Sequence, residues 1–102
     1  MAILYIAEYS RAADNSLGGF NQIADEASLQ AEQTVTFTTT TQSSAFNAAT
    51  RFVRIHTDSI CHILFGTNPT ATTGKKRMAA NTTEYFAVPP GASYKVAAVT
   101  GT

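Results

Sequence analysis

The stretch RFVRIHTDSICHILF, residues 51–65, contains the two strongest strand signals of the chain. Residues 51–57 and 60–65 are both rich in β-branched, aromatic and other large apolar side chains, which favour extended backbone. The two runs flank Asp58-Ser59, and two such runs joined by two residues are typical of a β-hairpin. Asp-Ser is a weaker hairpin turn than Asn-Gly, because neither residue adopts positive φ as readily as glycine. The stretch predicts two strands joined by a tight turn.

Further segments with a strand pattern lie on both sides of this stretch and are separated by turn signals. In residues 33–41, threonines alternate with Val35 and Phe37, as expected of a strand with one buried face. Pro90-Gly91 is well placed at the centre of a type II turn. The other candidate strands are residues 3–9, 77–79, 84–88 and 93–99. This pattern predicts an all-β fold, a small β-sandwich or barrel of six to eight short antiparallel strands.

Residues 10–32 are polar, with scattered apolar side chains and no strand pattern. A short helix over residues 23–31 has too few apolar residues at helical spacing to be expected. Loops longer than about 15 residues are uncommon in compact domains and are usually functional. We therefore expect an extended loop or arm whose apolar side chains dock on this subunit or on a neighbouring one. Those partner-binding candidates are Leu17, Phe20, Ile23 and Leu29.

The composition fits one small domain, residues 1–102, whose surface carries few charges. Charged residues make up 14% of the chain, against about 25% in ordinary domains, and threonine and serine supply much of the remaining polarity. Such a surface favours association, so we expect a homo-oligomer, a dimer or a trimer. The charged residues within positions 1–50 are mostly acidic and those within positions 51–102 are mostly basic, although the net charge of the chain is +0. This split predicts neutralisation inside the fold or contact between neighbouring copies.

The only cluster with metal-binding or nucleophilic potential is His56, Cys61 and His62. Hairpin pairing would place His56 opposite Cys61 and His62 opposite Ile55, so the two histidines would point to opposite faces. A structural zinc site needs about four ligands. As the only cysteine, Cys61 lies in an apolar run, which predicts a buried, inert thiol. We expect no metal, no cofactor and no catalytic site, and hence a protein that is not an enzyme.

Lys75, Lys76 and Arg77 form a basic triplet, which can be a solvated loop tip or a contact for an acidic protein surface. Nucleic acid is a weaker alternative, because the net charge is zero and no aromatic residues are interleaved with the cations. Tyr85, Phe86 and Tyr94 can form a sugar-stacking platform, but at alternating spacing such residues are more often core and edge residues.

The first residues lack the basic region of a signal peptide and reach Glu8 early, so no secretion is expected. No apolar stretch approaches the length of about 18 residues that would span a membrane. A single cysteine fits a chain made in a reducing cytoplasm.

Several strings of the sequence resemble small virion-associated proteins of tailed bacteriophages, and the resemblance covers most of the chain outside residues 11–30. The strings carry no chemistry, so the match is one of pattern. They are IAEYS at 6–10, SAFN at 44–47, TRFVRIHTDSIC at 50–61, FGTNPTAT at 65–72, MAANTTEYFAVPPG at 78–91 and YKVA at 94–97.

The resemblance implies a structural role in the virion of a phage assembled in the cytoplasm of a host bacterium. The implied role is either that of a head decoration (cement) protein, which binds and stabilises the major capsid shell, or that of a head-tail connector or a tail or baseplate component, and the resemblance does not choose between them. We expect a decoration protein whose partner is the major capsid protein or another virion protein, with no nucleic-acid or membrane partner. A carbohydrate- or receptor-binding β-module that uses Tyr85 and Tyr94 is the alternative from another class.

Overall fold

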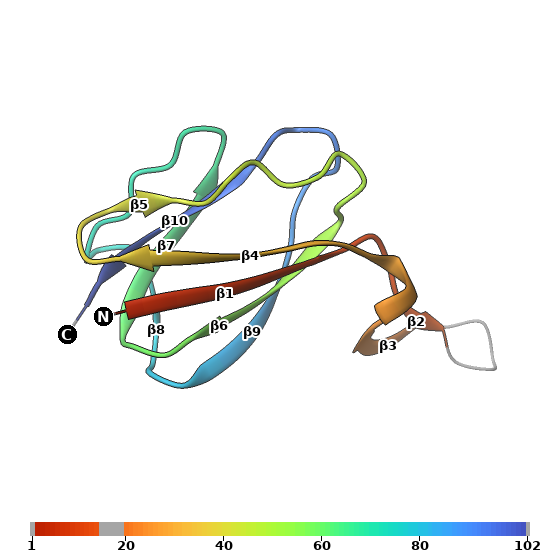
Figure 1. Cartoon of the computed structure of the whole chain (residues 1–102), viewed down its shortest axis with the longest axis horizontal. Coiled ribbons are helices and arrows are strands. Elements are labelled where there is room, and N and C mark those ends of the chain that lie inside the picture. Colours follow the sequence, from red (N-terminus) through yellow and green to blue (C-terminus); the bar gives the residue numbers. More distant parts are fainter. Residues whose placement is uncertain (1, 15–19, 102) are drawn as a thin grey trace.

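The computed structural model describes residues 2–14 and 20–101, with the side chains of residues 13, 14 and 20–23 left aside. Eight antiparallel strands form two four-stranded sheets that pack face to face as a β-sandwich (Figure 1). The predicted all-β fold is therefore confirmed, and of the two predicted architectures the sandwich is the one found.

Each sheet is named here after its long inner strand. The β1 sheet has the order β4 (Leu29–Phe37), β1 (Ala2–Tyr9), β6 (Phe52–Thr57) and β9 (Thr82–Ala87). The β10 sheet has the order β5 (Thr41–Gln42), β10 (Lys95–Thr100), β7 (Cys61–Gly66) and β8 (Lys76–Met78). Outside the sandwich lie a two-stranded hairpin, β2 (Ala12–Asp14) and β3 (Phe20–Ala24), and a short 3-10 helix, η1 (Glu26–Ser28).

The core lies between the two sheets and follows the alternation of apolar residues along each strand. Leu4 and Ile55 are completely buried from the β1 sheet, and Ile63 is buried from the β10 sheet. Val35 and Phe37 face inward from β4 while its threonines face solvent, as the sequence predicts. The φ of Gly91, 73°, is the value that a type II turn requires at its third residue.

The hairpin predicted over residues 51–65 is wrong, because β6 and β7 lie in different sheets and do not pair. The connection at Asp58-Ser59 is instead an arch that crosses the core. A two-residue type I′ turn requires positive φ at both central residues, and neither Asp58 nor Ser59 has it. The carboxylate of Asp58 accepts a hydrogen bond from the backbone N–H of Ile3 at 2.8 Å, which ties the arch to the start of β1.

The predicted pairing of the histidines fails with the hairpin. His56 lies beside Tyr5 of β1 and Thr83 of β9, whereas His62 lies beside Val99 of β10. Each histidine therefore sits on the outer face of its own sheet, and the sandwich core separates the two.

The segment 10–32, predicted to be an extended loop or arm, contains regular secondary structure in its described part. It contains the hairpin β2–β3, the helix η1 and the first four residues of β4. The sparse apolar residues gave no alternation signal, because these strands lie outside the sandwich and have no core to cover. The helix considered for residues 23–31 is a single 3-10 turn, which ends because Leu29 adopts an extended conformation.

Candidate partner-binding site

The hairpin β2–β3 projects from one end of the sandwich along its longest dimension (Figure 1). The molecule measures 43 × 26 × 21 Å along its principal axes, so it is elongated in the direction of this arm. We call residues 10–28, as far as they are described, the arm. A projecting element of this kind can reach a surface that the sandwich itself does not touch.

The base of the arm is fixed by a set of hydrogen bonds centred on the buried residue Ser28. The backbone N–H of Ser10 donates to the carbonyl of Ser28 at 3.1 Å, and the Ser28 hydroxyl lies 3.1 Å from the Arg11 carbonyl and 2.8 Å from the Asp25 carbonyl. The Arg11 N–H also donates to the Ser28 hydroxyl at 3.3 Å. The two segments of the chain that form the arm are thus joined where they leave the sandwich.

An ion pair supports the same base from the solvent side. Nε of Arg11 lies 2.6 Å from a carboxylate oxygen of Asp25. The hydrogen bond from Arg11 and a second from the Ala27 N–H hold the pKa of Asp25 below its ordinary value. Because this pair is exposed, its contribution to stability is small, and its effect is to orient the two segments of the arm relative to each other.

Tyr9 connects the arm to the outer face of the β1 sheet. Its side chain is only 3% exposed, stacks on Phe52 with ring centroids 5.3 Å apart, and donates its hydroxyl to the Glu26 carboxylate at 2.7 Å. Burial, followed by the hydrogen bond to Glu26, raises the pKa of Tyr9 from 10.0 to about 12. The neutral phenol is therefore the form that holds η1 on the sandwich.

This contact predicts a loss of stability at high pH. Above pH 10 the unfolded chain loses the Tyr9 proton while the folded chain keeps it up to about pH 12, so the folded state binds more protons in that range and its stability falls as pH rises. We expect the midpoint of urea unfolding to decrease between pH 10 and 12 more in the native protein than in the Y9F variant. An identical decrease in both proteins would contradict the assignment to Tyr9.

The apolar residues predicted to bind a partner have different positions in the structure. Leu17 lies outside the described residues, and Phe20 and Ile23 lie in β3, with only their backbone described. Leu29 is the first residue of β4, is half-buried and pairs with Tyr9, so it belongs to the base of the arm and not to its tip. The backbones of Phe20 and Ile23 are thus in the projecting hairpin, and their partner-binding role stays a prediction.

The basic triplet lies outside the arm, at the β8 edge of the β10 sheet. All three residues are exposed; Lys75 precedes β8, and Lys76 and Arg77 lie within it. The ammonium of Lys76 lies 5.6 Å from the centroid of the Phe86 ring, a cation–π distance. Two of the three residues are therefore part of an edge strand, where charged side chains also discourage unwanted strand pairing.

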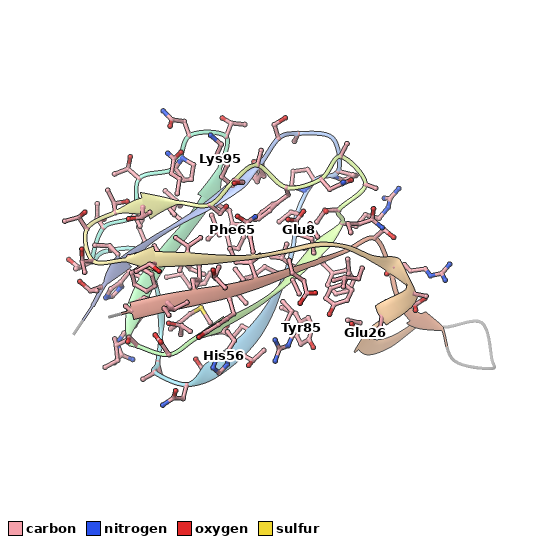
Figure 2. The ribbon with its side chains drawn as sticks, in the orientation of Figure 1. Glu8, Glu26, His56, Phe65, Tyr85 and Lys95 are labelled. Atoms are coloured by element: carbon pink, nitrogen blue, oxygen red, sulfur yellow. The ribbon has the colours of Figure 1, made fainter. Side chains whose placement is uncertain are left out.

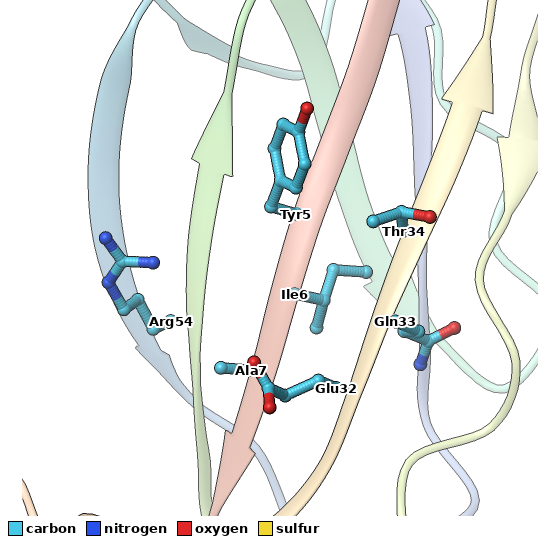
Figure 3. Close-up of a pocket in the computed structure, with 7 residues that line it drawn as sticks. All are labelled: Tyr5, Ile6, Ala7, Glu32, Gln33, Thr34 and Arg54. Atoms are coloured by element: carbon cyan, nitrogen blue, oxygen red, sulfur yellow. The ribbon is translucent and has the colours of Figure 1, made fainter.

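The outer face of the β1 sheet is a second candidate surface, and the sequence analysis did not identify it. The exposed large apolar side chains among the described residues are Tyr5, 42% exposed, and Tyr85, 51% exposed. The strand register places both on this face, where Figure 2 labels Tyr85. A shallow hollow of about 320 Å³ lies between β4, β1 and β6 (Figure 3). Its lining residues are Tyr5, Ile6, Ala7, Glu32, Gln33, Thr34 and Arg54.

Glu8, which Figure 2 labels, is a buried charged residue that was not predicted from the sequence. Its side chain is only 1% exposed. One of its carboxylate oxygens accepts hydrogen bonds from the Asn47 N–H at 2.7 Å and from the Thr50 hydroxyl at 2.8 Å. The other lies 3.4 Å from the side-chain nitrogen of Gln33. Glu8 thus fixes the connection between β5 and β6, and its partners are neutral donors. The available signal was its position in the same alternation as Leu4 and Ile6.

The residues considered for chemistry are not brought together. Among residues 2–14 and 20–101, no group of three or more His, Cys, Asp or Glu side chains is placed to hold a metal ion. Cys61 is completely buried, as predicted, and burial raises the pKa of its thiol. Neighbouring residues Tyr85 and Phe86 point to opposite faces of β9, and Tyr94 packs against the core, so these three rings do not form one platform.

Comparison of the chain with family models, with curated proteins and with solved structures gives no match. No helix in the described part of the chain combines the length and the apolar character needed to cross a membrane.

Proposed function

We propose that the protein is a structural component of a tailed-bacteriophage virion, specifically a capsid decoration protein that binds and stabilises the major capsid shell. The observation that carries this proposal is the arm, which is hydrogen-bonded at its base and projects from the sandwich. The pattern resemblance of the sequence to virion-associated phage proteins supplies the biological setting. In this role the protein acts by binding and not by catalysis.

The two parts of the molecule suit different tasks in such an assembly. The sandwich is a rigid platform, because its core is closed and its connections are fixed by contacts such as those of Asp58 and Glu8. The arm contains β3, the strand of Phe20 and Ile23, and its backbone projects from that platform. A pre-ordered base reduces the conformational entropy that is lost when the arm meets a shell protein.

A head-tail connector or tail component is the second candidate, since it needs the same combination of platform and arm. The two roles differ in copy number, because a decoration protein covers the whole shell whereas a connector or tail ring uses few copies.

The test is quantitative peptide mass spectrometry on purified phage particles, with the major shell protein as the internal reference. A copy number comparable to that of the shell protein is the expected result. A small fixed number per particle would replace decoration by the connector or tail role. Absence from the particles would overturn the virion proposal and would reopen the sugar-binding alternative.

A further inference from the structure

The outer face of the β1 sheet has a pattern of side chains that is complementary to itself. In register across the strands, Ala7 lies between Glu32 of β4 and Arg54 of β6. The next strand, β9, continues this row with Tyr85. The row therefore runs from a carboxylate over a small side chain to a guanidinium.

Glu32 and Arg54 do not neutralise each other within one molecule. Their α-carbons are separated by two strand spacings, about 10 Å, and among the described side chains neither has a hydrogen-bonded or ion-pair partner. Figure 3 shows Glu32 extending over Ala7 and Arg54 extending away from it toward β9. Both charges remain available to a second molecule.

We propose that two copies of the chain associate through this face, related by a two-fold axis that runs along the strands between β1 and β6. Such an axis places β1 of one copy over β6 of the other and keeps each row at the same height. Arg54 of each copy then enters the hollow above Ala7 of the other and meets its Glu32. Because the interface is isologous, the ion pair forms twice.

The neighbouring row supports the same axis. Tyr5 and His56 are adjacent on β1 and β6, with ring centroids 6.1 Å apart within one molecule. The two-fold operation places Tyr5 of one copy over His56 of the other, again twice. The rings of Tyr5 and His56 are therefore covered by the second copy in the row next to the paired charges. Aromatic side chains are enriched in such interfaces.

The size of the face sets the strength of the association. Four strands about 4.8 Å apart and about six residues long at about 3.4 Å per residue give roughly 400 Å² of face per copy. The total for two copies is below the roughly 1,200–2,000 Å² of stable interfaces. The expected dimer is weak, and salt weakens it further because its specificity rests on exposed charges.

The inference deepens the proposed function, because the same axis directs the arms of both copies to the same end of the dimer. A pair of arms at one end gives a bivalent attachment, which raises the apparent affinity for a shell with repeated sites.

The test is sedimentation velocity of the purified protein at low salt with two reciprocal charge reversals, E32K and R54E. Each variant alone brings like charges together twice, so we expect its dimer dissociation constant to rise about tenfold or more. An equimolar mixture of the two variants restores both ion pairs, so it should form heterodimers. The matched controls are K95E, on the outer face of the β10 sheet, and E84K, at the sandwich edge; both should dimerise as the native protein does.

A change that leaves the charges untouched gives an independent test of the hollow. In the A7L variant the larger side chain fills the space that Arg54 of the second copy needs, so dimerisation should also be lost. A native protein that stays monomeric at all concentrations would overturn the inference. So would a dimer that E32K, R54E and A7L leave unchanged, provided that circular dichroism shows each variant to be folded. These measurements need no phage particles, so their failure is separate from failure of the decoration role.

Discussion

The E8A variant is expected to lose about 3 kcal/mol of unfolding free energy, because the buried Thr50 hydroxyl and the part-buried Asn47 N–H lose their acceptor. The Asn47 N–H and the Thr50 hydroxyl both bond to one oxygen of Glu8, at 2.7 and 2.8 Å. Each buried donor left without a partner costs about 1–3 kcal/mol. Urea unfolding should show a lower midpoint with an unchanged slope, since the folded and unfolded states keep their exposed areas.

The E8Q variant separates the role of the acceptor from the role of the charge. A glutamine side-chain oxygen can accept both hydrogen bonds, so we expect a loss below about 1 kcal/mol. The E32A variant is the matched control for an exposed glutamate and should change stability by less than about 0.5 kcal/mol. A large loss in E8Q would mean that the negative charge itself stabilises the fold. No loss in E8A would show that the connection between β5 and β6 does not depend on Glu8.

Shortening the arm is expected to abolish attachment to the particle while leaving the sandwich folded. Ala12 and Ala24 are paired in the β2–β3 hairpin, so an Asn-Gly turn in place of residues 13–23 can join them directly. The hydrogen bonds of Ser28 lie on the sandwich side of this deletion and remain. We expect the shortened protein to unfold cooperatively, as the native protein does. On particles from which the native protein has been removed, we expect its occupancy to be at least about tenfold lower than that of the native protein, because about 1.4 kcal/mol of contact energy corresponds to a factor of ten.

The comparison for this deletion is a full-length variant in which Lys75, Lys76 and Arg77 are replaced by alanine. Those residues lie in or directly before the edge strand β8 and are outside the arm. If the arm carries the contact, this variant should bind particles at nearly the native level. Retained occupancy of the arm-shortened protein, together with loss in the triple variant, would transfer the contact to the basic edge.

The strands of the sandwich could be predicted from local alternation, whereas the partner of each strand could not. Val35 and Phe37 identify the inward face of β4 by period two alone. The runs around Asp58-Ser59 have the same local appearance in a hairpin and in an arch. What distinguishes the arch is the bond from the Ile3 N–H to Asp58, which joins residues 55 positions apart and leaves no local signal.

The candidate surfaces also differ in how far they could be predicted, because a local pattern is visible in the sequence and a pairing between distant residues is not. The arm was expected because a long polar stretch interrupts the strand pattern, but its hairpin lacks the alternation that a core imposes. The outer face of the β1 sheet depends on β1, β4 and β6 being neighbours, so the row of Glu32, Ala7 and Arg54 exists only once the register is known. The burial of Glu8 likewise depends on donors from residues 47 and 50.

The arch at Asp58-Ser59 has a consequence for how the chain folds. Because β6 and β7 go to different sheets, β6 pairs only with β1 and β9, which are distant in sequence, and β5 pairs with β10 through Gln42 and Ala97. Pairings between such distant residues require large loops to close before contacts form, which places folding in the millisecond-to-second range typical of β-sandwiches. On the ribosome, the β10 sheet cannot form until its inner strand β10, Lys95–Thr100, has been synthesised, because β5 and β7 precede it in sequence and both pair with it.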